Sequence, residues 1–401
     1  MTKKSDAPAI RFKGFSDAWE QRKFEEIAVR SSVICSDDTL PRVEYEDIVS
    51  GTGRLNKDIY AKQSSKSGIA FHQGDVLYGK LRPYLQNWLL PTFDGLAVGD
   101  FWVLQPQNAD SSFLYRLIQS RQFDEVANQS TGTKMPRADW KLVSKTVFSI
   151  PSNISEQAAI GTYFTALDSL ITLHQRKFEK LTNVKKSMLE KMFPQNGSSY
   201  PEIRFKGFTD PWEQRKVSDL AEKTYGGGTP TTSNEAYWNG DIPWIQSSDV
   251  VDGKLLGVEP RKWITQDGLN NSAAQLIPGN SIAIITRVGV GKLAFMPYSY
   301  ATSQDFLSLS KLNAEPLFTV YACYKKLQSE LNAVQGTSIK GITKDELLAK
   351  NIMVPRYAEQ QQIGAFFKQL DNLITLHQRK PFLMKWRNSD ANRNQTNRLV
   401  L

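Results

Sequence analysis

The run from residue 155 to residue 193 has apolar positions at alternating spacings of three and four, apart from one skipped turn. This spacing is typical of a helix that packs one face against another helix. The positions are Ile160, Phe164, Leu167, Ile171, His174, Phe178, Leu181, Met188 and Met192, and the pattern returns at Ile363, Phe367, Leu370, Ile374 and His377. We therefore expect two long helices that pair as an antiparallel coiled coil about a pseudo-two-fold axis, with both histidines as ordinary residues of the apolar face.

The rest of the chain alternates short β-rich runs with turn signals, as at residues 43–51, 74–91 and 99–106. The second half repeats this plan at residues 241–253 and 281–295. Shorter helices are expected near residues 112–128 and 317–334. The mixture predicts an α+β fold with two tandem α/β-mixed domains joined by the long helices.

Two segments of the chain occur twice. IRFKGFSDAWEQRK at 10–23 returns as IRFKGFTDPWEQRK at 203–216, and LITLHQRK at 170–177 returns unchanged at 373–380. The middles share only landmarks: 47–51 aligns with 249–253, Arg82 with Arg287, 100–101 with 305–306, and 132–133 with 336–337. We expect the two halves to share a fold. The near-identical ends are expected to bind a common partner, and the divergent middles are expected to bind different ones.

The predicted helices set the domain boundaries. Ser155, followed by Glu156 and Gln157 just after Pro151, is a typical helix start. Pro381 is predicted to end the second helix near residue 380, because a proline inside a helix costs about 3 kcal/mol. The predicted parts are an N-terminal domain at 1–150, a first spacer helix at 151–197, a C-terminal domain at 198–354, a second and shortened spacer helix at 355–380, and a divergent tail at 381–401.

Composition restricts the setting in which the chain works. The net charge of +9 favours a polyanionic partner, although many globular proteins are modestly basic. Two cysteines cannot make a disulfide framework, and three histidines scattered singly give no metal-ligand spacing. With no apolar signal region and no run of about 18 apolar residues, we expect a cytoplasmic protein with no membrane partner.

Motifs for chemistry on DNA are missing from the sequence. It contains neither the Pro-Pro pair of methyltransferases that act on base amino groups nor the Pro-Asp start of common metal-dependent nucleases. Residues 289–292 resemble the end of a phosphate-binding loop, but the earlier glycine and the Ser or Thr after Lys292 are absent. We interpret them as a strand–turn–strand and expect a non-catalytic chain that holds no cofactor of its own.

Each middle carries cations among aromatic and small polar residues, a mixture that suits double-stranded DNA. Arg and Lys contact phosphates or guanine edges, and Gln can read adenine. The candidates are Lys80, Arg82, Tyr84, Lys134 and Arg137 in the first middle and Gly227, Thr229, Arg287, Lys292, Gln304, Ser338 and Lys340 in the second. The glycine-rich run at 225–230 could hold a phosphate on its N–H groups or be only a flexible turn. Any one of the cations could equally be a solvated strand end.

Jointly, these segments resemble the specificity subunit of type I restriction-modification enzymes. The resemblance covers nearly the whole chain and rests on GGTPTTSNEAYWNGDIPWIQSSDV at 227–250, GDVLYGKLRPYL at 74–85 and the two LITLHQRK segments. It also rests on two runs from Gly-Thr through proline to Glu-Gln, namely Gly132, Pro151 and Glu156 with Gln157, then Gly336, Pro355 and Glu359 with Gln360. The tail after Lys380 departs from the family, whose second helix runs on.

The resemblance implies two target-recognition domains that each read one half of a bipartite, asymmetric DNA site, with the paired helices as a ruler between them. It implies two modification subunits that use S-adenosylmethionine to methylate adenine, and restriction subunits that hydrolyse ATP, with Mg²⁺, to translocate and cleave DNA. Two other hypotheses stay open. The chain could be a truncated or silent variant that folds but does not assemble, or a stand-alone enzyme on DNA, which the missing motifs disfavour.

Overall fold

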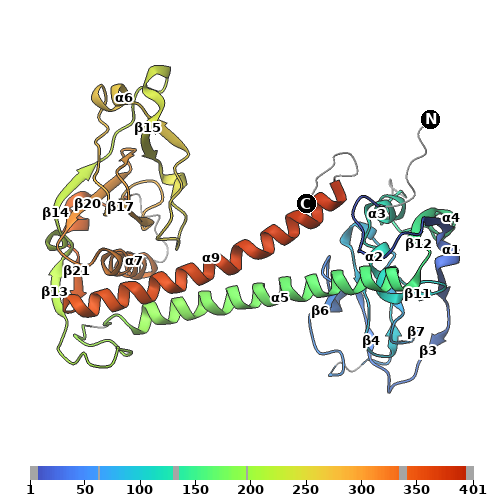
Figure 1. Ribbon diagram of the computed structural model, residues 1–401. Helices are drawn as coiled ribbons and strands as arrows, with labels where there is room; N and C mark the ends of the chain where they lie inside the picture. Colours follow the sequence, from blue (N-terminus) through green and yellow to red (C-terminus); the bar gives the residue numbers. More distant parts are fainter. Residues whose placement is uncertain (1–7, 62–63, 130–134, 196, 334–340, 394–401) are drawn as a thin grey trace. The chain divides into compact units, whose positions relative to one another are not determined.

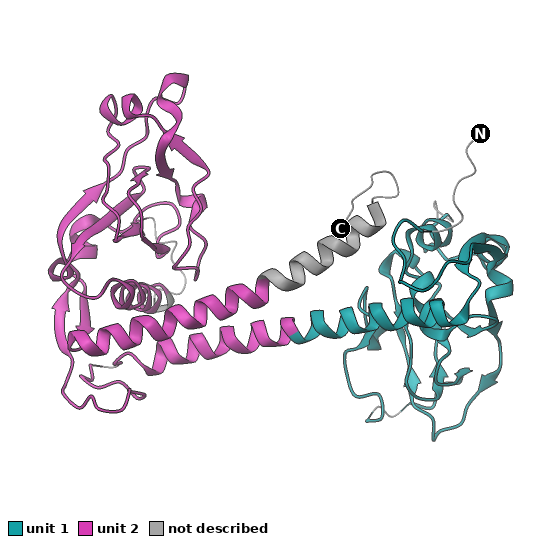
Figure 2. Cartoon of the chain, viewed as in Figure 1, with its two compact units in different colours: residues 1–173, 382–401 teal, residues 174–381 magenta. Residues whose placement is uncertain are grey.

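The computed structural model describes the backbone of residues 8–61, 64–129, 135–195, 197–333 and 341–393 (Figure 1). The chain divides into two compact units: unit 1 comprises residues 1–173 and 382–401, and unit 2 comprises residues 174–381 (Figure 2). Each unit mixes strands with helices, so the predicted α+β class is confirmed.

Unit 1 is built around two four-stranded sheets with strand orders β2-β11-β8-β9 and β3-β7-β10-β4, and β1 pairs with β12. The strands are β1 (Trp19–Lys23), β2 (Ala28–Ser31), β3 (Ile34–Cys35), β4 (Arg42–Val43), β5 (Ile48–Val49), β6 (Arg54–Leu55), β7 (Gly68–Phe71), β8 (Val76–Gly79), β9 (Trp88–Leu89), β10 (Gly95–Ala97), β11 (Phe101–Pro106) and β12 (Val147–Pro151). The helices are α1 (Phe24–Ile27), α2 (Ser111–Leu117), α3 (Arg121–Ala127) and α4 (Trp140–Lys145), with short 3-10 turns η1 (Tyr45–Asp47) and η2 (Pro83–Leu85).

The central strands of unit 1 are covered on both faces. Tyr78 and Trp102 point into one apolar cluster, whereas Leu77 and Val103 point into another. Successive side chains of a strand face opposite sides of the sheet, so β8 and β11 separate the two clusters. This double burial explains why the strand sequences read as continuous apolar runs.

Unit 2 repeats this plan. Its main sheet has the order β14-β20-β17-β18, a smaller sheet has the order β16-β15-β19, and β13 pairs with β21 as β1 does with β12. The strands are β13 (Glu213–Lys216), β14 (Ala221–Gly226), β15 (Trp238–Ile245), β16 (Lys262–Ile264), β17 (Ser281–Ile285), β18 (Leu293–Met296), β19 (Ala301–Thr302), β20 (Phe306–Leu312) and β21 (Asn351–Val354). The shorter helices are α6 (Gln266–Asn270), α7 (Pro316–Ala333) and α8 (Lys344–Leu348), with 3-10 turns η3 (Val217–Leu220), η4 (Glu235–Tyr237) and η5 (Ser247–Asp249).

The two shorter predicted helices fare differently. The helix expected at 317–334 is α7, displaced by one residue at each end. The single helix expected at 112–128 is wrong, because the chain forms α2 and then α3 with a break between them. Ser120 causes a new start: its side chain accepts a hydrogen bond from the N–H of Phe123 and so caps α3.

Two long helices follow the two sheet domains in sequence. They are α5 (Ile154–Lys191) and α9 (Tyr357–Arg393), and α5 matches the predicted span to within two residues. The prediction that the second helix ends near residue 380 is wrong, since α9 continues through Pro381. A proline removes one N–H from the helical ladder, here the one that would bond to the carbonyl of His377, while the bonds on either side can still form. The divergent tail therefore begins inside the helix.

Within unit 2, α5 and α9 run antiparallel. As residue numbers rise along α5 and just past its end, the contacted residues of α9 have progressively lower numbers. The contacts are His174 Nδ1 to His377 Nδ1 at 2.8 Å, Lys185 Nζ to Asp371 Oδ1 at 2.6 Å, and Phe193 to Phe367 with ring centroids 6.0 Å apart.

The predicted helix-pairing residues lie on covered faces of the two helices. In unit 2, Ile363, Phe367 and Leu370 are buried in the main apolar core and Ile374 is half-buried. In unit 1, Ile171 is buried, and Ile160, Phe164 and Leu167 are half-buried. This burial agrees with one apolar face on each helix; a continuous coiled coil along both helices stays a prediction.

Candidate nucleic-acid interface

In unit 1 a backbone frame joins three segments that are distant in sequence. The N–H of Lys80, just after β8, donates to the carbonyl of Asp100 at 2.9 Å. The N–H of Ala138, just before α4, donates to the carbonyl of Lys80 at 2.8 Å. The frame thus brings Lys80, Arg82 and Arg137 to one end of the central sheet.

Unit 2 has the same frame. The N–H of Thr286 donates to the carbonyl of Asp305 at 2.8 Å, and the N–H of Ile342 donates to the carbonyl of Thr286 at 2.8 Å. The loop after β17, the start of β20 and the segment before α8 therefore meet as their counterparts do in unit 1.

The frame corrects one of the expected landmarks. Lys80 and Thr286 make the same two backbone bonds and so occupy equivalent positions. Counting on by one residue, Arg287 corresponds to Leu81. The alignment of Arg82 with Arg287 is therefore wrong by one residue, because the register of the strands is set by backbone hydrogen bonds and not by matching residue types.

Asp100 holds two of the candidate cations of unit 1. Its carboxylate lies 3.1 Å from Arg137 and 3.5 Å from Lys80. Partial burial would raise the pKa of Asp100, but the hydrogen bonds and charges of Arg137 and Lys80 outweigh this and hold the pKa below its ordinary value. The hydroxyl of Tyr45 donates to the Asp100 carbonyl at 2.8 Å, and burial raises the pKa of Tyr45, so this donor keeps its proton.

Arg82 and Tyr84 lie in a tight loop after β8. Arg82 has a left-handed backbone with φ of 49°, and its N–H donates to the carbonyl of Pro136 at 2.7 Å. Pro83 then starts η2, and Tyr84 is left 57% exposed. A left-handed arginine costs conformational energy, so the loop shape is imposed by the surrounding contacts.

In unit 2 the glycine-rich run is fastened to the start of β20. The hydroxyl of Thr229 donates to Oε1 of Gln304 at 2.7 Å, and the N–H of Gly228 donates to the carbonyl of Thr302 at 2.8 Å. A Cβ on Gly227 would lie 1.9 Å from the carbonyl oxygen of Ser303. The interpretation of this run as a flexible turn is therefore wrong, and the N–H of Gly228 is already used within the chain.

Arg287 and Lys292 lie on the turn between β17 and β18. Gly289 and Gly291 both have φ of 93°, which a tight turn requires, so the strand–turn–strand interpretation is confirmed. Arg287 is exposed and Lys292 half-buried. The candidates Lys134, Ser338 and Lys340 lie outside the described residues.

Sequence reasoning missed a cation on aromatic rings in unit 2. The Lys262 ammonium lies 5.5 Å from the ring centroid of Trp238 and 5.8 Å from that of Trp244. Trp263, next to it on β16, is 39% exposed. The Arg-Lys-Trp run at 261–263 is a basic and aromatic signal that could have pointed to this surface.

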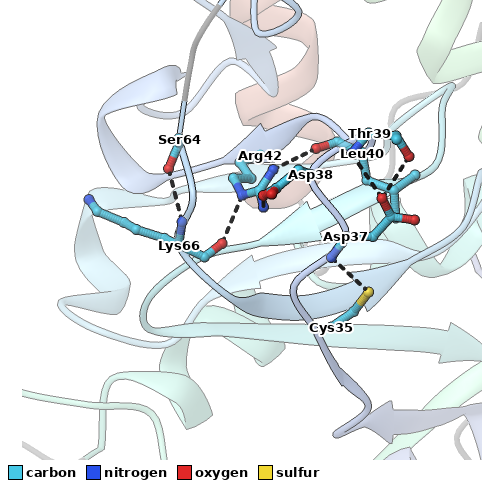
Figure 3. Close-up of polar contacts among 8 residues, drawn as sticks. All are labelled: Cys35, Asp37, Asp38, Thr39, Leu40, Arg42, Ser64 and Lys66. Atoms are coloured by element: carbon cyan, nitrogen blue, oxygen red, sulfur yellow. Dashed lines mark hydrogen bonds and ion pairs between the residues drawn. The ribbon is translucent and has the colours of Figure 1, made fainter.

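A polar hollow of about 720 Å³ lies in unit 1 between residues 38–42 and 64–66. Arg42 is 4% exposed, and its guanidinium donates to the carbonyl of Lys66 at 2.8 Å, to that of Leu40 at 3.1 Å and to Asp38 at 2.9 Å (Figure 3). Because every nitrogen of this guanidinium bonds within the chain, we interpret Arg42 as a structural clamp.

Two further features are missing among the described residues. None of their helices combines the length and the apolar character needed to cross a membrane. No three His, Cys, Asp or Glu side chains among them are grouped so that they could hold a metal ion.

Comparisons with known proteins match this architecture. Residues 209–382 match the family described as type I restriction modification DNA specificity domain. The chain is 31% identical over 227 residues to the EcoR124I/EcoR124II specificity subunit of Escherichia coli, covering 55% of this chain and 52% of the relative. It is 29% identical over 170 residues to the MjaIX specificity subunit of Methanocaldococcus jannaschii, covering 41% and 38%. The chain thus spans about half or less of the length of these two relatives.

A solved structure extends the likeness to the whole fold. The type I restriction-modification S subunit from M. genitalium has a TM-score of 0.62 at 11% identity, covering 98% of this chain and 100% of that one. The duplicated α+β units with their long helices are thus the fold of a type I specificity subunit. The family match at residues 209–382 and the similarity to the two specificity subunits confirm the resemblance found in the sequence.

Proposed function

We propose that this chain is the DNA-specificity subunit of a type I restriction-modification complex, and that each unit reads one half of a bipartite, asymmetric site. The repeated backbone frame carries the proposal, because it presents different side chains in the two units. Lys80 stands where unit 2 has Thr286, and Arg137 stands where unit 2 has Gly341. A constant frame with changed side chains supports recognition of two different half-sites.

The near-identical segments support two copies of one partner. LITLHQRK lies in α5 and again in α9, so the same surface chemistry is offered twice. In this proposal two modification subunits dock on the helices, the helices set the spacing of the half-sites, and restriction subunits join the complex in the cytoplasm. The chain itself is non-catalytic and holds no cofactor; S-adenosylmethionine, ATP and Mg²⁺ belong to the partners.

A second candidate is a silent variant that folds but does not assemble. It is favoured by the sequence after Lys380, where the second copy departs from FEKLTNVKKSMLEKMF, the continuation of the first, and begins with proline. The modification subunit would then lack half of its docking surface.

Co-expression with a type I modification subunit, followed by genome-wide mapping of methylated adenines, tests the two candidates. A bipartite motif with an unspecified central spacer is expected for the specificity subunit. Absence of methylation, together with absence of a complex on size-exclusion chromatography, would instead establish the silent variant.

Point variants assign the half-sites. Arg82→Ala is expected to relax one half of the motif and Arg287→Ala the other, each by about 1 to 3 kcal/mol if the side chain contacts a base. Arg356→Ala is the charge-matched control, because Arg356 is exposed, pairs with Asp210 at 2.9 Å and makes none of the backbone bonds of either frame. Unchanged motif preference in both test variants would refute the assignment of these two arginines.

A further inference from the structure

The two copies of the segment IRFKGF, at 10–15 and 203–208, make the same ion pair with the long helix that follows. Arg11 lies 2.6 Å from Glu156, and Arg204 lies 2.8 Å from Glu359. Both glutamates are buried. Identical sequence has therefore produced identical local docking in each unit.

What covers the two copies is different. Ile203 packs against the main core of unit 2, and its N–H donates to the carbonyl of Lys191 near the end of α5 at 2.9 Å. Ile10, the same residue in unit 1, is 78% exposed. Trp212 is 3% exposed, whereas its counterpart Trp19 is half-buried.

The cover in unit 2 is the end of α5 and the residues just after it. Leu189, Met192 and Phe193 are buried in the main core, with the Phe193 ring centroid 5.9 Å from that of Trp212. Four residues before Leu189, Lys185 is 7% exposed and pairs with Asp371. One face of α5, apolar except for Lys185, thus covers the core of unit 2.

The described residues of unit 1 include the counterparts of this surface, and they are more exposed. Phe12 is 37% exposed and Tyr163, which it contacts at a centroid distance of 5.6 Å, is 50% exposed. Asp168, the counterpart of Asp371, pairs with Arg116 at 2.7 Å within unit 1, and its side chain is 51% exposed, against 15% for Asp371. We name the surface of Ile10, Phe12, Trp19, Tyr163 and Asp168 the open socket.

The second repeat lacks the apolar sequence that covers unit 2. Residues of α5 and of the second copy correspond at a separation of 203 positions, as LITLHQRK shows. Where the first copy has Val184, Lys185, Met188, Leu189, Met192 and Phe193, the second has Arg387, Asn388, Ala391, Asn392, Gln395 and Thr396. Five of these six residues are polar, and an apolar surface offers polar side chains no stabilisation.

We propose that the open socket of unit 1 binds an amphipathic helix from another polypeptide, one with the apolar and lysine pattern of residues 181–193. The occupant is defined by unit 2, where a helix of that pattern fills the equivalent surface. A second copy of this chain does not qualify, because its own segment 181–193 is packed in its own unit 2. The proposal does not rest on DNA recognition by either unit.

A labelled peptide with the sequence of residues 177–193, added to the full chain, tests the proposal by fluorescence anisotropy. Saturable binding is expected, and Ile10→Glu is expected to weaken it by about tenfold or more, as for a central apolar contact. Ile34→Glu is the matched control, because Ile34 in unit 1 is 76% exposed and lies outside the socket. A peptide with Leu189→Asn, Met192→Gln and Phe193→Thr, the residues of the second copy, is expected not to bind.

A graft provides a measurement that does not need an isolated peptide to become helical. Residues 381–396 are replaced by the sequence of residues 178–193, and hydrogen exchange of residues 10–19 is followed. The graft is expected to slow exchange there, and a graft carrying Asn, Gln and Thr at the three apolar positions is not. Peptide binding that Ile10→Glu leaves unchanged, or no binding together with no protection in the graft, would overturn the proposal.

Discussion

The main sheets of unit 1 and unit 2 have equivalent strand orders, but the two units complete their apolar cores with different parts of the chain. The described core clusters of unit 1 draw on α5 only as far as Ile160, whereas the main core of unit 2 contains Leu189, Met192 and Phe193. Those residues precede the second IRFKGF segment and belong to the first repeat. The two units therefore differ in what stabilises them, because the core of unit 2 includes residues at the end of α5 that belong to the first repeat.

The sharpest test of this difference removes the aromatic ring at the end of the delivered segment. Phe193→Ala is expected to destabilise unit 2 by about 3 to 5 kcal/mol, since the ring is buried among Trp212, Phe318 and Phe367. Unit-resolved hydrogen exchange should show faster opening in unit 2 and no change in unit 1. Tyr163→Ala, at a half-exposed position in unit 1, is the control; equal losses in both units would contradict the comparison.

The lysine of the same segment should have the next largest effect. Lys185→Ala leaves the Asp371 carboxylate with Tyr321 alone in a largely buried site, and a loss of about 3 kcal/mol in the stability of unit 2 is expected. Denaturant titration of the variant measures it. Lys191→Ala, on the same helix, breaks only an exposed pair with Glu202 and should cost less than about 1 kcal/mol. Similar losses from the two lysines would show that the burial of Lys185 is unimportant.

The candidate interface of unit 2 can be broken through its backbone. Gly227→Ala places a Cβ 1.9 Å from the carbonyl oxygen of Ser303, so the strands must shift, at roughly 1 to 3 kcal/mol. Gly226→Ala meets nothing within 4 Å and is the matched control. Thermal unfolding should separate the variants, and methylation mapping should show relaxed preference in one half-site only. Equal behaviour of the two variants would show that the close approach does not hold the loop.

The smallest expected effect is a dependence of stability on pH in unit 1, through the Asp100 carboxylate of its frame. The pKa of Asp100 is lowered by Arg137 and Lys80, so its ion pairs add stability above the ordinary aspartate pKa, and this is lost as pH falls through the lower, folded value. The loss should therefore appear below about pH 4. Comparing acid titrations of the wild-type chain and Asp100→Asn by hydrogen exchange in unit 1 checks this. An unchanged acid profile in the variant would exclude Asp100 as the group.

The sequence predicted best the long helices, which depend on the spacing of apolar residues within one segment. The spacing of apolar residues gave α5 and α7 to within two residues, since each buries one continuous face. Ser120 was a readable cap within the run at 112–128, but it competes with an otherwise helical pattern. The predicted end of the second helix at Pro381 was wrong, because the loss of one backbone hydrogen bond did not end the helix.

The candidate site depended on contacts that spacing does not encode. Thr229 meets Gln304 across 75 positions of sequence, and the register that sets Thr286 opposite Asp305 is fixed by pairing between strands. Residue types alone therefore pointed to loops that the frame brings together, but they matched Arg287 with the wrong residue. The open socket was also invisible, because two identical segments differ only in what covers them.

The contact between His174 and His377 joins equivalent residues of the two LITLHQRK segments. Two identical rings therefore face each other where α5 and α9 meet. Their Nδ1 atoms are 2.8 Å apart, and such a bond needs one nitrogen that carries a proton and one that does not. A strictly symmetric pair cannot meet this requirement. The position of a single proton thus makes the two repeats unequal at their point of closest correspondence, even where the sequence around it is the same on both sides.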